Sequence, residues 1–433
     1  MLRDSELRSL THRVIPGGAH TYSKGDDQFP SNAPRYIEKG EGCYVWGDDN
    51  KRYLDWTMGL RSVSLGYGIE EVNDAVIKQI YKGANFCRPS YLETELALKI
   101  LELIPNGQMV KFAKNGSSVT TAATKLARAY TGRDYIALCK NHPFFSYDDW
   151  FIGTTLSNRG VPKSISDLSQ TFNYNDIASL EKLFLDYPNK IAAVILEPAT
   201  TEHPSNNFLS EVRNLCEKNG AVLIFDEMIT GFRWHLNGAQ TYYDVIPDLS
   251  TFGKGIANGF SLAALVGKRE IMELGDIFHS QKRVFLLSTT HGAENHSLAA
   301  ALATLNFFKE KEVVSHMWKM GGRLIEGINQ VVKEFGLEKY FSIGGIDCSP
   351  YYVCKDKNGN NSFEFRTLFL QEMVKEGILI NYIAPSYSHS QDTIDFTVSA
   401  VRKALKVYKM ALDKGVKHYL LGPAIKPVFR EYN

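Results

Sequence analysis

The sequence has almost no net charge and no long apolar run, and each absence excludes a class of protein. Among 433 residues, 49 Lys and Arg stand against 48 Asp and Glu, a formal charge of +1. Such a balance gives no field that attracts nucleic acid or an anionic membrane. No apolar stretch approaches the roughly 20 residues that span a bilayer, and the polar start MLRDSELRSL lacks the apolar core of a signal peptide. We expect a soluble, cytoplasmic protein with no nucleic-acid or membrane partner.

Cysteine is scarce and scattered. The sequence contains six, with no CxxC pair and no metal-ligand spacing, at Cys43, Cys87, Cys139, Cys216, Cys348 and Cys354. Most have apolar neighbours, which favours small buried side chains over disulfides. The sequence therefore predicts no metal site and no disulfide framework.

The sequence does contain an alternation of short apolar runs and amphipathic stretches. Residues 191–196 and 221–225 are continuous apolar runs, as expected of strands buried on both faces. Between these runs, apolar residues recur at helical spacing, at Leu209, Val212, Leu215 and Cys216. Strand, helix and strand in this order predict a βαβ unit and a parallel sheet.

The length favours more than one domain. We expect helices at residues 69–83, 91–103, 298–308 and 313–335. A large α/β domain is expected at 62–315, and a smaller α+β domain is expected from segments 1–61 and 316–433. The tail from Lys417 onward contains two prolines and predicts an extended arm.

Two charged residues stand where charge is unusual. Asp226 follows the apolar run 221–225, and a carboxylate there costs free energy unless a cation meets it. A protonated ring nitrogen would meet it, and an aspartate that caps a nearby loop is the alternative. Lys254 lies between Gly253 and Gly255, where backbone and ligand can approach closely. A desolvated lysine can form an imine with a carbonyl compound, and an ordinary loop lysine is the alternative.

A third feature follows the apolar run 109–113. Asn115-Gly116-Ser117-Ser118 precedes apolar residues at helical spacing. A helix that starts with small hydroxyl residues offers free N–H groups and a positive dipole end, which suit a phosphate. An ordinary serine N-cap is the alternative interpretation.

Two segments carry a resemblance to a known family. Residues 223–233 and 247–254 resemble the ring-nitrogen and lysine motifs of the class III aminotransferases, which depend on pyridoxal 5'-phosphate (PLP). The nearest branch is glutamate-1-semialdehyde 2,1-aminomutase, whose opening phrase is similar to residues 16–20. The resemblance implies fold type I, with a mostly parallel seven-stranded sheet domain and a smaller α+β domain. It also implies a homodimer with shared active sites.

The resemblance assigns roles to residues that would surround the cofactor. The implied contacts are Lys254 as the Schiff-base lysine, Asp226 at the ring nitrogen, Gly116 and Ser117 at the phosphate with Ser118 adjacent, Met228 beneath the ring, Glu197 near the ring, and Thr290 at the phosphate of the neighbouring subunit. Thr289 replaces Thr290 if the alignment slips by one residue. A structural strand-end hydrogen bond is the alternative for Glu197.

The sequence departs from the family on the substrate side. The aromatic residue that stacks on the cofactor falls in residues 142–150, where Phe144 is our choice and His142 and Phe145 are alternatives. Lys24 stands where the aminomutases have an arginine, and lysine lacks the planar two-bond grip on a carboxylate. The candidates for a changed substrate pocket are Lys24, Tyr22, His20 and Arg61, each of which could instead be a solvated loop residue.

These departures favour retained PLP chemistry on a changed substrate. We expect an aminotransferase that acts on an aldehyde or keto acceptor, sugar- or polyol-derived and phosphorylated or nucleotide-linked, in surface polysaccharide synthesis. An intramolecular aminomutase is the first alternative, and the Lys24 replacement argues against it. A non-catalytic PLP-binding regulator is another alternative, but no DNA-reading segment is appended to the chain.

Overall fold

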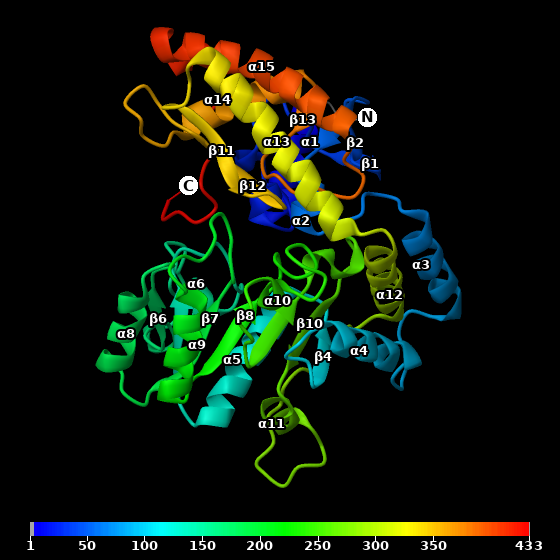
Figure 1. Cartoon of the computed structure of the whole chain (residues 1–433). Helices are drawn as coiled ribbons and strands as arrows, with labels where there is room; N and C mark the ends of the chain where they lie inside the picture. The colour runs from blue at the N-terminus through cyan, green and yellow to red at the C-terminus, as the bar shows by residue number, and fades with distance from the viewer. Residues whose placement is uncertain (1–3, 433) are drawn as a thin grey trace. The chain divides into compact units, whose positions relative to one another are not determined.

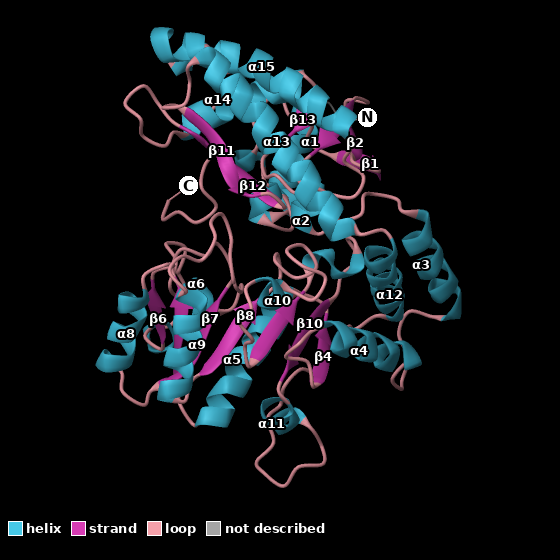
Figure 2. Ribbon diagram, in the orientation of Figure 1, coloured by secondary structure: helices cyan, strands magenta, loops and turns pink. Residues whose placement is uncertain are grey.

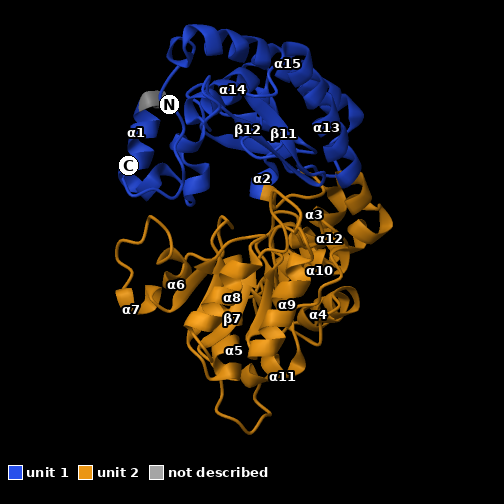
Figure 3. Ribbon diagram, turned by 60° about the vertical axis from the view of Figure 1, so that its left-hand side comes forward, with its two compact units in different colours: residues 1–60, 318–433 blue, residues 61–317 orange. Residues whose placement is uncertain are grey.

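The computed structural model describes residues 4–432 and divides into two compact units. The large unit comprises Arg61–Met317, and the small unit comprises Met1–Leu60 with Trp318–Asn433 (Figure 3). The small unit is therefore assembled from the two ends of the chain.

The large unit is built on a seven-stranded sheet with the strand order β4-β10-β9-β8-β7-β5-β6 (Figure 1). Its strands are β4 Met109–Ala113, β5 Tyr135–Cys139, β6 Ser169–Phe172, β7 Ile191–Leu196, β8 Val222–Asp226, β9 Leu249–Phe252 and β10 Ala263–Gly267. Strand β10 runs antiparallel to its neighbours β4 and β9, and the other pairs are parallel. The prediction of a mostly parallel seven-stranded sheet is confirmed.

The large unit also contains helices, some of which pack on this sheet (Figure 2). They are α3 Glu70–Lys82, α4 Tyr91–Leu103, α5 Gly116–Thr131, α6 Asp149–Ile152, α7 Lys163–Ser166, α8 Ile177–Asp186, α9 Phe208–Asn219, α10 Ala239–Tyr242, α11 Arg269–Met272 and α12 Asn295–Glu310, with short 3₁₀ turns at η4 Lys254–Ala257 and η5 Glu273–Gly275. Strands β7 and β8 are buried throughout and share one apolar core with α8 and α9. The predicted βαβ unit is present as β7, α9 and β8.

The small unit contains a four-stranded sheet and a hairpin. The sheet consists of β1 Ile37–Glu41, β2 Tyr44–Gly47, β3 Arg52–Asp55 and β13 Ile378–Leu379, and the hairpin of β11 Phe341–Ile346 and β12 Ser349–Cys354. Its helices are α1 Asp4–Val14, α14 Phe363–Lys375 and α15 Gln391–Lys414, with 3₁₀ turns at η1 Pro16–Gly18, η2 Tyr22–Lys24, η3 Asp26–Gln28 and η6 Val416–His418. Helices α2 Met58–Arg61 and α13 Val313–Phe335 cross from one unit to the other.

The tail is hydrogen-bonded within the small unit. The Leu421 N–H donates to Gln371 Oε1 at 2.7 Å, and the Ile425 N–H donates to Thr367 Oγ1 at 2.9 Å. The Lys426 N–H donates to the Asp27 carbonyl at 2.9 Å. The tail therefore packs on α14 and on the N-terminal segment.

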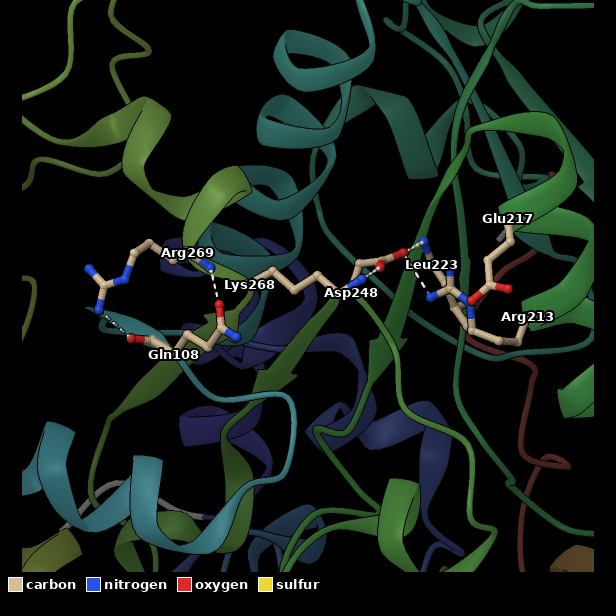
Figure 4. Close-up of polar contacts among 7 residues, drawn as sticks. All are labelled: Gln108, Arg213, Glu217, Leu223, Asp248, Lys268 and Arg269. Atoms are coloured by element: carbon tan, nitrogen blue, oxygen red, sulfur yellow. Dashed lines mark hydrogen bonds and ion pairs between the residues drawn. The ribbon is translucent and has the colours of Figure 1, made fainter.

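A charge cluster at the amino ends of β8 and β9 holds the two strands in register (Figure 4). Asp248 Oδ2 accepts hydrogen bonds from Arg213 Nη1 and from the Leu223 N–H, each at 2.8 Å. Its Oδ1 lies 2.6 Å from Lys268 Nζ. Because β8 and β9 carry polar residues at their opposite ends, this cluster also positions those residues.

Within residues 4–432, no helix is both long and apolar enough to cross a membrane. In the same range, no group of His, Cys, Asp and Glu side chains could hold a metal ion. All six cysteines are free, and all but Cys87 are buried.

Candidate active site

Three polar side chains lie at the carboxyl ends of neighbouring strands. Leu196 of β7 pairs with Phe225 of β8, so Glu197 follows one strand beside Asp226 of the other. Asp226 in turn pairs with Thr251 of β9, and Lys254 comes shortly after that strand. The carboxyl ends of parallel strands are where open α/β sheets bind ligands.

Asp226 is buried and held in a fixed orientation. Its Oδ1 accepts hydrogen bonds from the Met228 N–H at 3.0 Å and from Thr251 Oγ1 at 3.1 Å. Burial raises the pKa of Asp226 to about 6, and the charge of Lys254 opposes this rise. Two hydrogen bonds therefore hold the carboxyl group in place, and Lys254 is its cationic neighbour.

The Lys254 amine shares this environment. Burial lowers the pKa of Lys254, while the carboxylates of Glu197 and Asp226 act in the opposite direction. A lowered pKa increases the share of neutral amine, the form that attacks a carbonyl carbon and accepts a proton. Lys254 also has a positive φ of 40°, a strained backbone conformation of the kind that occurs at functional sites.

The loop that carries Lys254 packs closely against its neighbours, and glycines at 253 and 255 make this close packing possible. A Cβ on Gly253 would lie 2.6 Å from Met228 Sδ, and a Cβ on Gly255 would lie 2.6 Å from Ser64 Oγ. A Cβ on Gly116 would lie 2.9 Å from the same Met228 sulfur. Met228 therefore packs against both the lysine loop and the start of α5, and this places the predicted phosphate-binding residues beside the lysine.

The start of α5 is capped by Asn115, whose Oδ1 accepts the Ser118 N–H at 3.0 Å. Ser118 Oγ donates to the same oxygen at 3.1 Å, which engages that hydroxyl in the cap. Ser117 is buried, and its Oγ accepts the Tyr147 N–H at 3.1 Å. The N-terminus of this helix, 16 residues long, provides the positive dipole end that favours a phosphate.

The three aromatic candidates for stacking on the ring differ in exposure. Phe144 is 46% exposed and meets Phe151 edge-on, whereas Phe145 is 2% exposed. His142 is also buried, and its Nδ1 accepts the Glu197 N–H at 2.9 Å. Phe144 is therefore the candidate that a ligand can reach, and His142 has a different role that the sequence did not indicate.

Two arginines complete the charges around Lys254. Arg61, the first residue of the large unit, and Arg233 both lower the pKa of Lys254. Arg233 is buried, and its Nη2 donates to Ser64 Oγ at 3.4 Å. We selected Arg61 from the sequence but missed Arg233, although Arg233 ends the segment 223–233 that carries the family resemblance.

The remaining candidates lie on exposed segments of the chain. His20, Tyr22 and Lys24 belong to the small unit and are exposed there. Thr289 and Thr290 lie in the large unit and are exposed too. The Thr290 carbonyl accepts a hydrogen bond from Asn85 Nδ2 at 2.9 Å.

The residues around Lys254 fit PLP. The cofactor has an aldehyde, a ring nitrogen para to that aldehyde, and a phosphate arm. Lys254 supplies the amine, the buried Asp226 supplies an anion for the ring nitrogen, and the start of α5 supplies N–H groups for the phosphate. The buried Glu197 Oε2, which no described residue hydrogen-bonds, indicates that a ligand completes the site.

Comparison with known proteins gives the same assignment. Residues 27–405 match the family model "Aminotransferase class-III". The chain is 30% identical to 3-aminobutyryl-CoA aminotransferase of Cloacimonas acidaminovorans (strain Evry), and the match covers 95% of this chain and 99% of that protein. It is also 30% identical to glutamate-1-semialdehyde 2,1-aminomutase of Syntrophobacter fumaroxidans, over 93% of this chain and 97% of that protein.

Solved structures agree. The PLP internal aldimine form of the FumI protein of Sphingopyxis sp. MTA144 has a TM-score of 0.86 and 25% identity, over 95% of this chain and 97% of that one. An omega-transaminase from Sphaerobacter thermophilus, at 24% identity, has a TM-score of 0.85 over 94% of this chain and 98% of that one, and supports the fold. The chain therefore belongs to the class-III aminotransferases, and it is an enzyme whose cofactor is pyridoxal phosphate.

Proposed function

We propose that this enzyme moves an amino group from an external amine donor to an aldehyde or keto acceptor, with Lys254 as the acid–base residue. The observation that carries the proposal is the placement of Lys254 shortly after β9, whose Thr251 pairs with the buried Asp226 at the end of β8. A covalent amine and an anion for the ring nitrogen are the two groups that this chemistry requires from the protein.

When bound, PLP supplies an electron sink for the negative charge that develops on the substrate carbon. Lys254 Nζ, as a neutral amine, takes the proton from that carbon and later returns it. Asp226 keeps the ring nitrogen protonated, because an adjacent negative charge favours the positive form. Met228 would pack beneath the ring, and Phe144 would cover its other face. Ser117, with Gly116 and Ser118 beside it at the start of α5, binds the phosphate.

The acceptor is proposed to be sugar- or polyol-derived, phosphorylated or nucleotide-linked, and used for surface polysaccharide synthesis. The sequence departures on the substrate side, above all Lys24 in place of an arginine, support a substrate other than that of the aminomutases. Arg61 supports an anionic substrate group, because its charge interacts with that of Lys254. His20 and Tyr22 remain predictions for the same pocket.

The competing proposal is an aminomutase, which moves the amino group within one molecule. It is favoured by the 30% identity to glutamate-1-semialdehyde 2,1-aminomutases from two bacteria. An external donor separates the two proposals, because only an aminotransferase consumes a donor for net turnover. The enzyme loaded with pyridoxamine phosphate should be screened against keto and aldehyde acceptors, with absorbance near the visible edge as the readout. An acceptor that restores this absorbance and supports donor-dependent turnover identifies an aminotransferase, whereas donor-independent isomerisation of one compound identifies an aminomutase.

We also propose that the enzyme works as a cytoplasmic homodimer. Helix α3 exposes large apolar side chains at helical spacing, at Ile77, Ile80 and Tyr81, and α4 exposes Tyr91 and Leu98. Contiguous apolar exposure of this kind marks protein–protein interfaces. Thr290, or Thr289, would then be supplied to the phosphate site of the partner subunit. Sedimentation at micromolar concentration should give twice the chain mass, and a Tyr81→Glu variant should shift the enzyme toward the monomer.

A further inference from the structure

Two buried glutamates at neighbouring strand ends have opposite surroundings. Glu227 follows Asp226, and its carboxylate accepts four hydrogen bonds. The donors are the Ala239 N–H at 2.5 Å, the Gln240 N–H at 3.2 Å, Gln240 Nε2 at 3.1 Å and Thr230 Oγ1 at 3.2 Å. Burial raises the pKa of Glu227, and these four donors lower it because they stabilise the negative charge.

Glu197 is equally buried but lacks such donors. Its Oε2 is buried and accepts no hydrogen bond from any residue between Asp4 and Tyr432. The contact made by His142 goes to the backbone of Glu197, because the Glu197 N–H donates to His142 Nδ1 at 2.9 Å. A buried carboxylate without hydrogen-bond donors is far more costly than a neutral carboxylic acid. A carboxylic acid has a proton to donate, and that proton requires an acceptor.

Burial and the charges near Glu197 together favour the neutral carboxylic acid. Asp226 raises the pKa of Glu197, and Lys254 and Arg61 lower it, but burial outweighs them and raises this pKa to about 8. Cys139, Tyr174 and His142 are further titratable groups near Glu197. Burial raises the pKa of the Cys139 thiol and of the Tyr174 hydroxyl, and it lowers the pKa of His142 to about 3.

The position of Glu197 also indicates which part of the cofactor it would face. Glu197 follows β7 beside Asp226, the residue assigned to the ring nitrogen, and Asp226 pairs with Thr251 just before Lys254, the residue assigned to the aldehyde. These two positions are joined along one edge of the ring by the hydroxyl-bearing carbon, and along the other edge by the carbon with the phosphate arm. The phosphate edge is assigned to Gly116 and Ser117, so the hydroxyl edge remains for Glu197.

We propose that Glu197 is a neutral carboxylic acid in the cofactor-loaded enzyme and donates a hydrogen bond to the hydroxyl-bearing edge of the cofactor ring. Glu197 is thus a cofactor-positioning acid, in contrast to Glu227, which stabilises the fold. This inference rests on the proposed placement of PLP between Lys254 and Asp226. It adds the protonation state and the direction of the hydrogen bond.

The first test is a pH titration of the absorbance of the bound cofactor, below about pH 8, with wild type and Glu197→Gln. Glutamine is neutral and also donates a hydrogen bond, so the proposal expects the two titration midpoints to agree. If Glu197 is ionised, the substitution removes a negative charge beside the protonated lysine nitrogen, and the midpoint falls by about one pH unit or more. A fall of that size overturns the proposal.

Infrared spectroscopy of enzyme labelled with ¹³C-glutamate gives a readout that does not depend on turnover. Cofactor-loaded wild type should show the carbonyl stretch of a protonated glutamic acid, and Glu197→Gln should lack it. The matched control is Glu202→Gln, which removes an exposed glutamate five residues further along and should retain the band. A spectrum in which Glu197→Gln removes no such band contradicts the proposal.

The third test addresses the edge of the ring. Glu197→Leu should weaken the binding of PLP to the cofactor-free enzyme about tenfold, in line with the loss of one buried hydrogen bond. The 3-deoxy analogue of PLP lacks the hydroxyl, so its affinity should be the same for wild type and variant. If Glu197→Leu loses affinity for PLP and for the 3-deoxy analogue equally, the assignment of Glu197 to the hydroxyl-bearing edge is wrong. If Glu197→Leu does not fold, the titration and the infrared band of Glu197→Gln decide the matter.

These outcomes differ from those that would refute the proposed function. If wild type binds no PLP at Lys254, the proposed function itself fails. If PLP binds at Lys254 but Glu197→Gln behaves as the loss of a negative charge, only the inference about Glu197 fails.

Discussion

Strands β8 and β9 have a buried aspartate at each end, and the two ends have opposite characters. At the amino end, Asp248 accepts two hydrogen bonds and pairs with the cations of Arg213 and Lys268. At the carboxyl end, Asp226 shares one cation, Lys254, with Glu197. A carboxylate whose partners are all supplied by the fold stabilises the fold. A carboxylate that competes for one lysine is available to a ligand.

The largest expected effect is that of removing the lysine at the carboxyl end. Lys254→Ala should reduce the transamination rate by about 10³-fold or more, because the acid–base group is lost. It should also abolish the absorbance of the covalently bound cofactor, measured in the same samples. Lys268→Ala, at the opposite end of the sheet, should lower the melting temperature and retain that absorbance. A Lys254→Ala enzyme with normal turnover would refute the assignment of Lys254.

The next largest effect separates the two aspartates in catalysis. Asp226→Asn should reduce kcat by about 10²-fold or more, because an amide cannot hold a proton on the ring nitrogen. Asp248→Asn should leave kcat per folded molecule within a factor of about three. Steady-state kinetics, corrected for the active fraction, measure both values. Similar losses in the two variants would show that the two ends of the strands are not functionally distinct.

The two aspartate variants should differ in the opposite direction in their free energy of unfolding. Asp248→Asn leaves Arg213 without its buried partner, so the free energy of unfolding should fall by about 2–4 kcal/mol. The ion pair between Asp248 and Lys268 adds little to this loss, because Lys268 is 42% exposed and solvent screens its charge. Asp226→Asn should change the stability of the cofactor-free enzyme little or raise it, because its desolvation cost disappears. Urea unfolding of cofactor-free protein measures both effects, and a larger loss for Asp226→Asn would contradict the comparison.

The smallest effect is a pH dependence. The pKa of Asp226 is raised to about 6, so its contribution to stability is present at low pH and is lost as the pH rises through about 6. PLP needs the ionised carboxylate, so cofactor binding offsets this loss. The rise in melting temperature on PLP loading should therefore be greater one pH unit above 6 than one unit below. Asp226→Asn should show no such difference, and a rise that is equal at both pH values in wild type would rule out this account.

Sequence patterns predicted the regular elements best where one strong signal acted alone. Helices at residues 91–103 and 313–335 have the predicted bounds, because their apolar periodicity is regular, and a capping box at Ser90 also marks the start of the first. The helix expected at 298–308 extends from Asn295 to Glu310, and its first turn buries the polar side chains of Asn295 and Ser297, which apolar periodicity does not mark. Strand β13, with two residues, was missed because its signal comes from parallel pairing with β3, more than 300 residues earlier.

The candidate site was predicted in part. The placement of Asp226, Glu197 and Lys254 at adjacent strand ends follows from apolar runs that form parallel strands. Arg233 and the observed role of His142 were missed, because they depend on contacts with Ser64 and with the Glu197 backbone, which are distant in sequence. The exposure of Phe144, against the burial of Phe145, is likewise a consequence of how the loop packs on α5 and Phe151.

By itself, the sequence determined the sheet and the residues that end its strands, because alternation, apolar runs and glycine positions act locally. The tertiary structure decided which of the charged residues are satisfied. Glu197 and Glu227 both follow apolar strands, yet one lacks hydrogen-bond donors at Oε2 and the other accepts four. The physical reason is that the free energy of a buried charge depends on the donors and charges packed around it, and packing brings these together from distant parts of the chain.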